Sequence, residues 1–122
     1  MECRDQNGDI LKHEENKPQW SVMPWDAIES VVRVFEYGAN KYNEPFTYYK
    51  EGLKYSSLFE SMLRHMIADY YYGEERDPDS GCLHLSHAAA NALMLIAAKN
   101  RPQDDDRPKH MQEVRLTAAG FR

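Results

Sequence analysis

Three polar side chains that could do chemistry lie within an otherwise apolar run over residues 82–99. His84, His87 and Asn91 occupy positions i, i+3 and i+7, a spacing that places them along one face of a helix. Because buried polar side chains need hydrogen-bond partners, this stripe must face other polar groups, a ligand or water. It indicates either a polar wall of an active site or a pair of core histidines bonded to backbone carbonyls.

A set of carboxylates precedes this stripe. Oxygen atoms are the ligands that hard divalent cations such as Mg²⁺ prefer, and such cations bridge the oxygens of a triphosphate. The set comprises Glu60, Asp69, Glu74, Glu75, Asp77 and Asp79. Its position just before the histidine stripe indicates a metal site that could hold a phosphorylated ligand.

Several of these carboxylates also fit structural roles. Glu60 completes a Ser-x-x-Glu pattern, which is typical of a capping box at a helix N-terminus. Asp77 and Asp79 are suited to shaping a turn and to capping the helix that follows. Asp69 lies one helical turn after His65, so these two side chains could pair with each other.

Cationic and aromatic residues gather between the first two helical segments. They are Lys41, Tyr42, Phe46, Tyr48, Tyr49 and Lys50. Lysines can pair with phosphates and aromatic rings can stack on a base. Such a long aromatic connection, over residues 40–54, predicts a binding loop. The alternative is a surface loop that its own aromatic side chains hold in place.

Hydrophobic periodicity predicts three helices as the elements that position these groups. The first should begin near Pro24 and end at Gly38 to Asn40, the second should run from Ser56 or Ser57 to about Tyr72, and the third from about Cys82 to Lys99. The predicted fold class is therefore all-α, a small helical bundle with three main helices per chain. Residues 1–16 are expected to form a flexible N-terminal arm, residues 17–100 the helical domain, and residues 101–122 a charged C-terminal tail.

Composition limits the partners and the compartment. The formal net charge of −5 argues against a nucleic-acid partner, because a polyanion requires a basic face. No stretch reaches the ~18 apolar residues of a membrane span, so no membrane association is expected. Cys3 and Cys82 form no disulfide framework and no zinc motif. We therefore expect a cytoplasmic protein.

Several motifs together resemble a known family. They are Lys17-Pro18, Pro24, the segment VRVFEYGANKY at residues 32–42, Arg64-His65, and the segment GEERDPDSGCLHLSHAAAN at residues 73–91. In order and spacing they are similar to the phage and bacterial dATP/dGTP diphosphohydrolases, which are MazG-like all-α nucleotide pyrophosphohydrolases. The resemblance covers roughly residues 17–97, and it makes residues 17–100 a MazG-like catalytic domain.

This resemblance implies a reaction and its partners. A purine deoxynucleoside triphosphate, dGTP or dATP, would be cleaved between its α and β phosphates to give the monophosphate and pyrophosphate. Mg²⁺ or Mn²⁺ would be the cofactor. A homodimer or homotetramer would complete the bundle, and the role would be to adjust the nucleotide pool during phage infection.

The chain departs from the wider MazG group at the metal ligands. That group carries Glu-Glu-x-x-Glu on one helix and Glu-x-x-Asp on the next, whereas here only Glu60 remains on the first and His84-x-x-His87 stands at the second. The residue roles are therefore hypotheses. The metal ligands would be Glu60, Asp69, Glu74 and Asp77. The catalytic residues would be Glu60, His65 and Asp77. Substrate would be bound by Lys17, Lys41, Tyr42, Lys50, Arg64, His84, His87 and Asn91.

Two other functions remain open at this point. One is a His/Asp metallophosphatase that acts on nucleoside monophosphates and is centred on His65 and Asp69. The other is a non-catalytic helical dimerisation module that uses the alanine-rich third helix as its seam. A plain seam would not need the His/Asn stripe, which favours an enzyme.

Overall fold

The computed structural model describes residues 16–46 and 52–112, and over these residues the predicted all-α fold is confirmed. Its elements are the 3₁₀ turn η2 (Trp20–Val22), the helices α1 (Trp25–Tyr42), α2 (Tyr55–Tyr70) and α3 (His84–Ala98), and the 3₁₀ turn η4 (Pro102–Asp104). Within these ranges the only β-type pairing is an isolated antiparallel bridge between Arg76 and Leu83. No helix of the described segments combines the length and the hydrophobicity needed to cross a bilayer.

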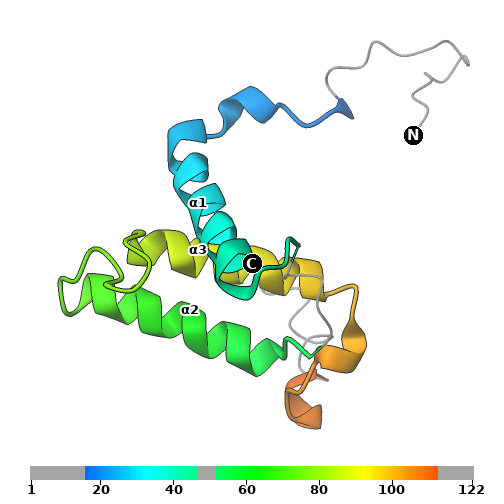
Figure 1. Ribbon diagram of the computed structural model, residues 1–122. Coiled ribbons are helices and arrows are strands. Elements are labelled where there is room, and N and C mark those ends of the chain that lie inside the picture. The colour runs from blue at the N-terminus through cyan, green and yellow to red at the C-terminus, as the bar shows by residue number, and fades with distance from the viewer. Residues whose placement is uncertain (1–15, 47–51, 113–122) are drawn as a thin grey trace, which may run out of the picture.

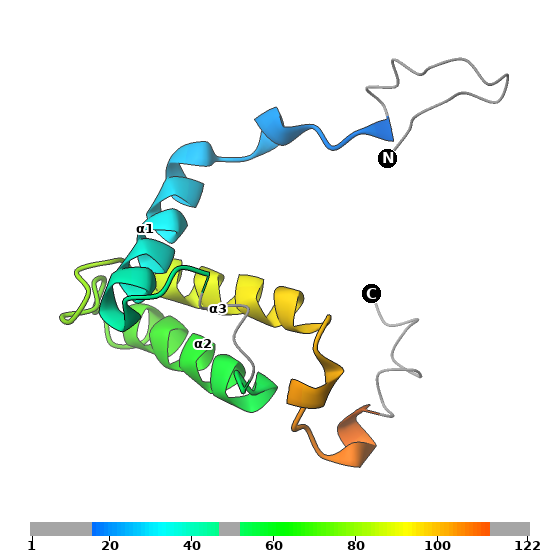
Figure 2. The same ribbon diagram turned by 45° about the vertical axis from the view of Figure 1, so that its right-hand side comes forward.

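The three long helices form a small, open assembly. Helices α2 and α3 run antiparallel and lie side by side, and the C-terminal half of α1 crosses them (Figure 1). The N-terminal half of α1 and the η2 segment extend away from α2 and α3, as the turned view also shows (Figure 2). The core therefore lies where α1 crosses the pair, and α3 contacts both of the other helices.

Small side chains let α1 approach α3 closely. Ala90, which is only 1% exposed, packs against Val31 and Val34 of α1. One helical turn before Ala90, the hydroxyls of Ser30 and Ser86 share a hydrogen bond of 2.7 Å across the same interface. A larger residue at position 90 would hold the two backbones apart, because helix separation depends on the side chains at the contact.

Helices α2 and α3 are joined at the opposite end by a second buried cluster. Tyr55 and Leu58 of α2 pack against Ala98, which is fully buried. The Tyr55 hydroxyl donates a 2.9 Å hydrogen bond to the Ala98 carbonyl at the C-terminal end of α3. This bond satisfies one of the carbonyls that a helix end leaves without an intrahelical partner.

The predicted end of the first helix is wrong, since α1 continues past Gly38 and Asn40 to Tyr42. Asn43 then adopts a left-handed conformation with φ of 51°, and its N–H bonds to the last turn of the helix. Asparagine tolerates this conformation better than most residues. A glycine inside a helix lowers its stability by about 1 kcal/mol without necessarily ending it, so Gly38 was a misleading signal.

The predicted side-chain caps are also wrong. Helix α2 begins at Tyr55 and α3 at His84, and neither N-cap residue makes a side-chain hydrogen bond to its helix. The capping-box role of Glu60 is therefore not realised. Asp106 takes over at α2, where its carboxylate accepts hydrogen bonds from the N–H and the hydroxyl of Ser56. A carboxylate is favourable there because the N-terminal end of a helix is positive.

The first part of the expected charged tail packs against the helices. Arg101 and Asp104 are both buried and form an ion pair of 2.9 Å. The other oxygen of Asp104 accepts a hydrogen bond from the backbone N–H of Gly52. The acidic run after α3 thus holds the start of α2 in place. By doing so it also fixes where the other residues of α2 lie.

The contact between α1 and α3 leads to a stability prediction. Replacing Ala90 with leucine should lower the free energy of unfolding by about 1–3 kcal/mol, because the added atoms overpack the crossing. Denaturant unfolding followed by circular dichroism measures this. Ala97→Leu is the matched control on the same helix, because Ala97 lines a shallow surface hollow with Val32 and Leu93 that has room for the added atoms. Equal losses in the two variants would contradict a tight contact at Ala90.

Candidate functional site

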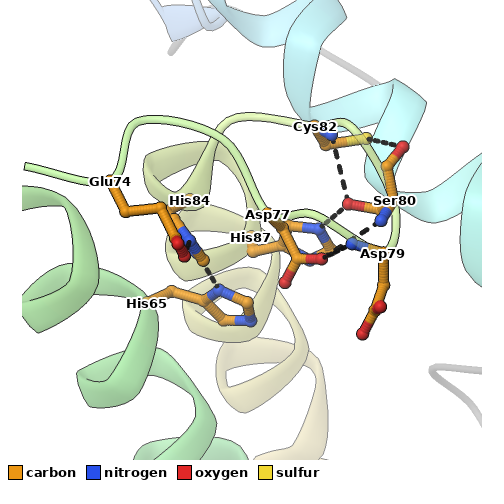
Figure 3. Close-up of polar contacts among 8 residues, drawn as sticks. All are labelled: His65, Glu74, Asp77, Asp79, Ser80, Cys82, His84 and His87. Atoms are coloured by element: carbon orange, nitrogen blue, oxygen red, sulfur yellow. Dashed lines mark hydrogen bonds and ion pairs between the residues drawn. The ribbon is translucent and has the colours of Figure 1, made fainter.

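Three imidazoles from two helices form the centre of the candidate site (Figure 3). His65 comes from α2, and His84 and His87 come from the first turn of α3. The Nδ1 atoms of His65 and His84 lie 2.8 Å apart. The rings of His65 and His87 stack, with centroids 4.4 Å apart and an interplanar angle of 10°. Because α2 and α3 run antiparallel, the C-terminal part of α2 meets the N-terminal part of α3 here.

The loop between α2 and α3 is tied together by its own backbone. Gly73, with φ of 69°, follows the end of α2 and donates its N–H to the Asp69 carbonyl. Asp77 N–H donates to the Cys82 carbonyl, and Gly81, with φ of 74°, donates to the Asp77 carbonyl. Positive φ favours glycine at these two positions. The predicted tight turn is therefore present, and it holds its side chains in fixed places.

This loop delivers two carboxylates and a hydroxyl to the imidazoles (Figure 3). Glu74 Oε1 lies 2.7 Å from His84 Nε2, and Ser80 Oγ lies 2.6 Å from His87 Nε2. Asp77 accepts hydrogen bonds through Oδ1 from the backbone N–H groups of Asp79 and Ser80. The sequence left open the alternative that these are core histidines bonded to backbone carbonyls. In the structure the ring contacts described above are made to side chains instead.

Burial and mutual repulsion keep two of the imidazoles neutral. Desolvation lowers the pKa of His65, and the neighbouring His87 and His84 lower it further. Desolvation also lowers the pKa of His87, although the charge of Asp77 acts in the opposite direction. Partial burial raises the pKa of Asp77, but the hydrogen bonds from Ser80 and Asp79 outweigh it, so the net shift is downward. Near neutral pH the site therefore offers neutral imidazoles beside an ionised carboxylate.

One group within the described residues has donor atoms close enough to hold a cation. His65, Asp77 and His84 each contribute one ligand atom, and these atoms all lie within 4.8 Å of one another. Neutral imidazole nitrogens and a carboxylate oxygen are donors that divalent metals accept. The donor set thus fits a metal ion, and it comes from α2, the loop and α3 together.

A cavity of about 580 Å³ opens beside the cluster, between α1, α2 and α3. His87 belongs to both, since it lines the cavity and stacks on His65. The polar residues of the wall are Tyr37, Lys41, Tyr42, Ser57, Ser61, His87 and Asn91. Ligand pockets commonly have volumes of ~300–1,000 Å³, so this cavity has room for a nucleotide.

The cavity wall is held by contacts between helices. Asn91 is buried, and its amide donates to Ser61 Oγ at 3.1 Å and to the His87 carbonyl at 3.0 Å. Tyr37 of α1 meets the His87 ring edge-on, with centroids 6.3 Å apart. Lys41 Nζ lies 5.8 Å from the Tyr37 ring and 5.5 Å from the Tyr42 ring. All three helices therefore contribute to one polar wall.

The structure brings together much of the set expected from sequence. His65, Glu74, Asp77, His84 and His87 form the cluster, and Lys41, Tyr42, His87 and Asn91 line the cavity. The suggested pairing of His65 with Asp69 is replaced by the contact of His65 with His84.

Other expected site residues lie elsewhere. Glu60 and Arg64 are exposed on α2 and belong neither to the cavity wall nor to the cation-binding group. Asp69 is partly buried near the end of α2 and is likewise outside that group. Lys17 is exposed in the segment before α1, which extends away from α2 and α3 (Figure 2). Lys50 lies outside the described residues.

Four polar site residues were missed by sequence reasoning. Tyr37, Ser57 and Ser61 line the cavity, and Ser80 holds His87. Tyr37 had one usable signal, because it precedes Lys41 by one helical turn and therefore shares its face. Ser61 and Ser80 have no such pattern, and only the packing of α2 and the loop against α3 brings them to the site.

The lowered pKa values of His65 and His87 predict an acid-sensitive fold. In the unfolded chain a histidine has a pKa of about 6.5, so below that pH the unfolded state binds protons that the folded state does not. The free energy of unfolding should therefore fall as pH drops from about 7 toward 5. Thermal unfolding in buffers containing a chelator would measure the loss. His87→Gln should flatten this pH dependence, while His110→Gln, at an exposed position, should retain it. Identical pH profiles for both variants would contradict the assignment.

Comparison with known proteins identifies the family of this chain. A family model described as dATP/dGTP diphosphohydrolase, N-terminal, matches residues 7–107, a range that contains all three long helices and the whole cluster. No curated protein and no solved structure matches the chain. The resemblance seen in the sequence motifs is confirmed, and the chain belongs to the dATP/dGTP diphosphohydrolase N-terminal family.

Proposed function

We propose that this chain hydrolyses purine deoxynucleoside triphosphates, dGTP or dATP, to the nucleoside monophosphate and pyrophosphate. The oxygen of water forms a bond to phosphorus, the bridging bond between the α and β phosphates breaks, and pyrophosphate leaves. The observation that carries the proposal is a nucleotide-sized cavity that shares His87 with a cluster of imidazoles and carboxylates. The family description supports the same substrate class.

The cavity has suitable groups for both ends of a nucleotide. Lys41 stands beside the rings of Tyr37 and Tyr42 and carries the positive charge of the wall. A lysine ammonium attracts phosphate oxygens, and tyrosine rings provide faces for stacking a purine. We therefore assign phosphate binding to Lys41, and base or sugar packing to the two tyrosines.

We assign to His87 the role of accepting the proton of the attacking water. It lines the cavity, and its lowered pKa keeps the ring neutral near pH 7. Stacking on His65 and the contact with Ser80 hold the ring in place. A neutral imidazole in a fixed position is an effective general base.

A divalent cation, Mg²⁺ or Mn²⁺, is part of the proposal. When bound, it would neutralise phosphate charge and act as a Lewis acid. His65, Asp77 and His84 would hold it, because their donor atoms converge. Glu60, Asp69 and Glu74 were the other carboxylates expected to bind metal. Of these, Glu74 instead contacts His84, and Glu60 and Asp69 lie outside the converging group.

We further propose a homodimer or homotetramer acting in the cytoplasm, where a phage-encoded chain would adjust the purine deoxynucleotide pool. Large apolar side chains on the projecting segment support an oligomer. Trp20 is 68% exposed and Trp25 is 48% exposed, and Ile96 on α3 is 66% exposed. Apolar surface of this kind is typical of contacts between subunits.

A product assay tests the proposed reaction. Purified full-length protein is incubated with a panel of deoxynucleoside and ribonucleoside triphosphates and either Mg²⁺ or Mn²⁺, and the products are separated by chromatography. We expect monophosphate and pyrophosphate from dGTP or dATP. Free phosphate released from monophosphates would instead support a metallophosphatase. No turnover, together with no thermal shift by dATP or dGTP, would support a non-catalytic helical module.

The role of His87 makes a separate prediction. His87→Ala should lower kcat by about 10²–10⁴, the usual contribution of a general base, with a smaller effect on KM. Steady-state kinetics over pH 5–9 measures this, and the acidic limb of the wild-type profile should disappear in the variant. His110→Ala is the matched control, because it removes an exposed histidine outside the site. Unchanged kcat in a folded His87→Ala protein would remove His87 from the mechanism.

A further inference from the structure

The arrangement of protons around His84 is fixed by its neighbours. His84 is buried, with 5% of its surface exposed, and its Nε2 lies 2.7 Å from Glu74 Oε1. An ionised carboxylate can only accept a hydrogen bond, so His84 Nε2 must carry the hydrogen and donate it. In the neutral ring the lone pair therefore resides on Nδ1, the atom that faces His65.

A carboxylate in this position is typical of metal-binding histidines. The second nitrogen of such a histidine usually donates to a carboxylate or carbonyl, which fixes the tautomer and makes the ligating nitrogen more basic. Glu74 makes this contact with His84, and the backbone N–H of His84 donates to the Glu75 carbonyl at 2.8 Å. The ring and the main chain of His84 are thus both held by the loop.

The separation between the facing imidazole nitrogens also suits a shared cation. His65 Nδ1 and His84 Nδ1 are 2.8 Å apart. Metal–nitrogen bonds of ~2.0–2.1 Å place two nitrogens of the same ion roughly 3 Å apart. Both atoms could bind one ion after moving by a few tenths of an ångström. In the metal-free cluster His65 Nδ1 donates its hydrogen to the lone pair of His84 Nδ1, and an ion would take the place of this hydrogen, with the hydrogen of His65 on Nε2 instead.

Asp77 adds an oxygen whose direction is fixed. Its Oδ1 accepts two backbone hydrogen bonds, from Asp79 at 2.7 Å and from Ser80 at 3.1 Å. These bonds fix the plane of the carboxylate and leave Oδ2 as the oxygen for a ligand. The donor set is therefore two imidazole nitrogens and one carboxylate oxygen.

From this donor set we infer that His65, Asp77 and His84 bind one transition-series divalent cation in preference to Mg²⁺, and that Glu74 orients His84. Imidazole nitrogens suit Zn²⁺, Fe²⁺ and similar ions, whereas Mg²⁺ requires oxygen ligands and gives up its water reluctantly. Within the transition series, Co²⁺ should bind more tightly than Mn²⁺, as these ions do at nitrogen and oxygen sites generally. This inference deepens the proposed function by naming the class of metal.

Metal binding without nucleotide tests the inference. Chelator-treated full-length protein is titrated with Co²⁺, Zn²⁺, Mn²⁺ and Mg²⁺ by calorimetry, and the visible absorption of Co²⁺ reports its ligands. We expect one Co²⁺ per chain, a cobalt spectrum that indicates nitrogen ligands, and at least ~100-fold weaker binding of Mg²⁺. Equal affinities for Mg²⁺ and Co²⁺ would overturn the inference.

Variants assign the ligands and the orienting residue. His84→Ala should abolish the Co²⁺ signal, and Glu74→Gln should weaken binding by about 10–100-fold, the usual effect of losing an orienting partner. Glu75→Gln is the matched control, because the carboxylate of Glu75 is exposed and only the backbone carbonyl of Glu75 contacts His84. Circular dichroism checks the fold of each variant, and Glu74→Gln keeps the test valid if His84→Ala does not fold. Equal binding by Glu74→Gln and Glu75→Gln would remove Glu74 from the site.

The two proposals fail in different ways. Tight Co²⁺ binding with no hydrolysis of any triphosphate would leave the metal site standing and reject the proposed function. Hydrolysis of dGTP or dATP that is supported by Mg²⁺ alone, without specific Co²⁺ binding, would keep the function and reject the imidazole site.

Discussion

The structure depends on hydrogen-bonding partners for the imidazoles that a mostly apolar helix carries at its start. Helix α3 is rich in alanine and packs against both other helices, yet it carries His84 and His87 at its start. Unpaired buried polar groups cost about 1–3 kcal/mol each. The loop meets this need with Glu74 and Ser80, and α2 meets it with His65. The positions of the loop and of α2 are therefore coupled to the histidines.

Two neighbouring faces of α3 have different tasks, since one packs against α1 and the other lines the cavity. Ala90 allows α1 to approach closely, and this places Tyr37 and Lys41 of α1 over the cavity. His87 and Asn91, on a neighbouring face, form the wall below them. The small side chain at position 90 thus contributes to the site by setting how closely α1 approaches α3. The cavity and the histidine cluster become one continuous site because His87 belongs to both.

The converging donor atoms of the candidate site differ from those that the family resemblance implies. The wider MazG group uses carboxylates on two helices, whereas the converging donors here are two imidazoles and the carboxylate of Asp77. Acidic residues still matter, but Glu74 acts on His84 and Asp77 is held by the backbone of its own turn. Membership of the dATP/dGTP diphosphohydrolase N-terminal family is therefore compatible with a donor set built mainly from nitrogen.

Sequence alone determined the all-α class, the three helices, and the stripe of His84, His87 and Asn91, because helical periodicity depends only on local spacing. It also singled out Lys41 and Tyr42 through their residue types. Only the tertiary structure decided which carboxylates join the histidines. Glu60 and Asp77 look equally suitable in the sequence, but the folding of the loop brings Asp77 to His65 and His84, while the rotation of α2 leaves Glu60 exposed. Contacts between distant segments depend on how the helices pack, and local spacing does not encode that packing.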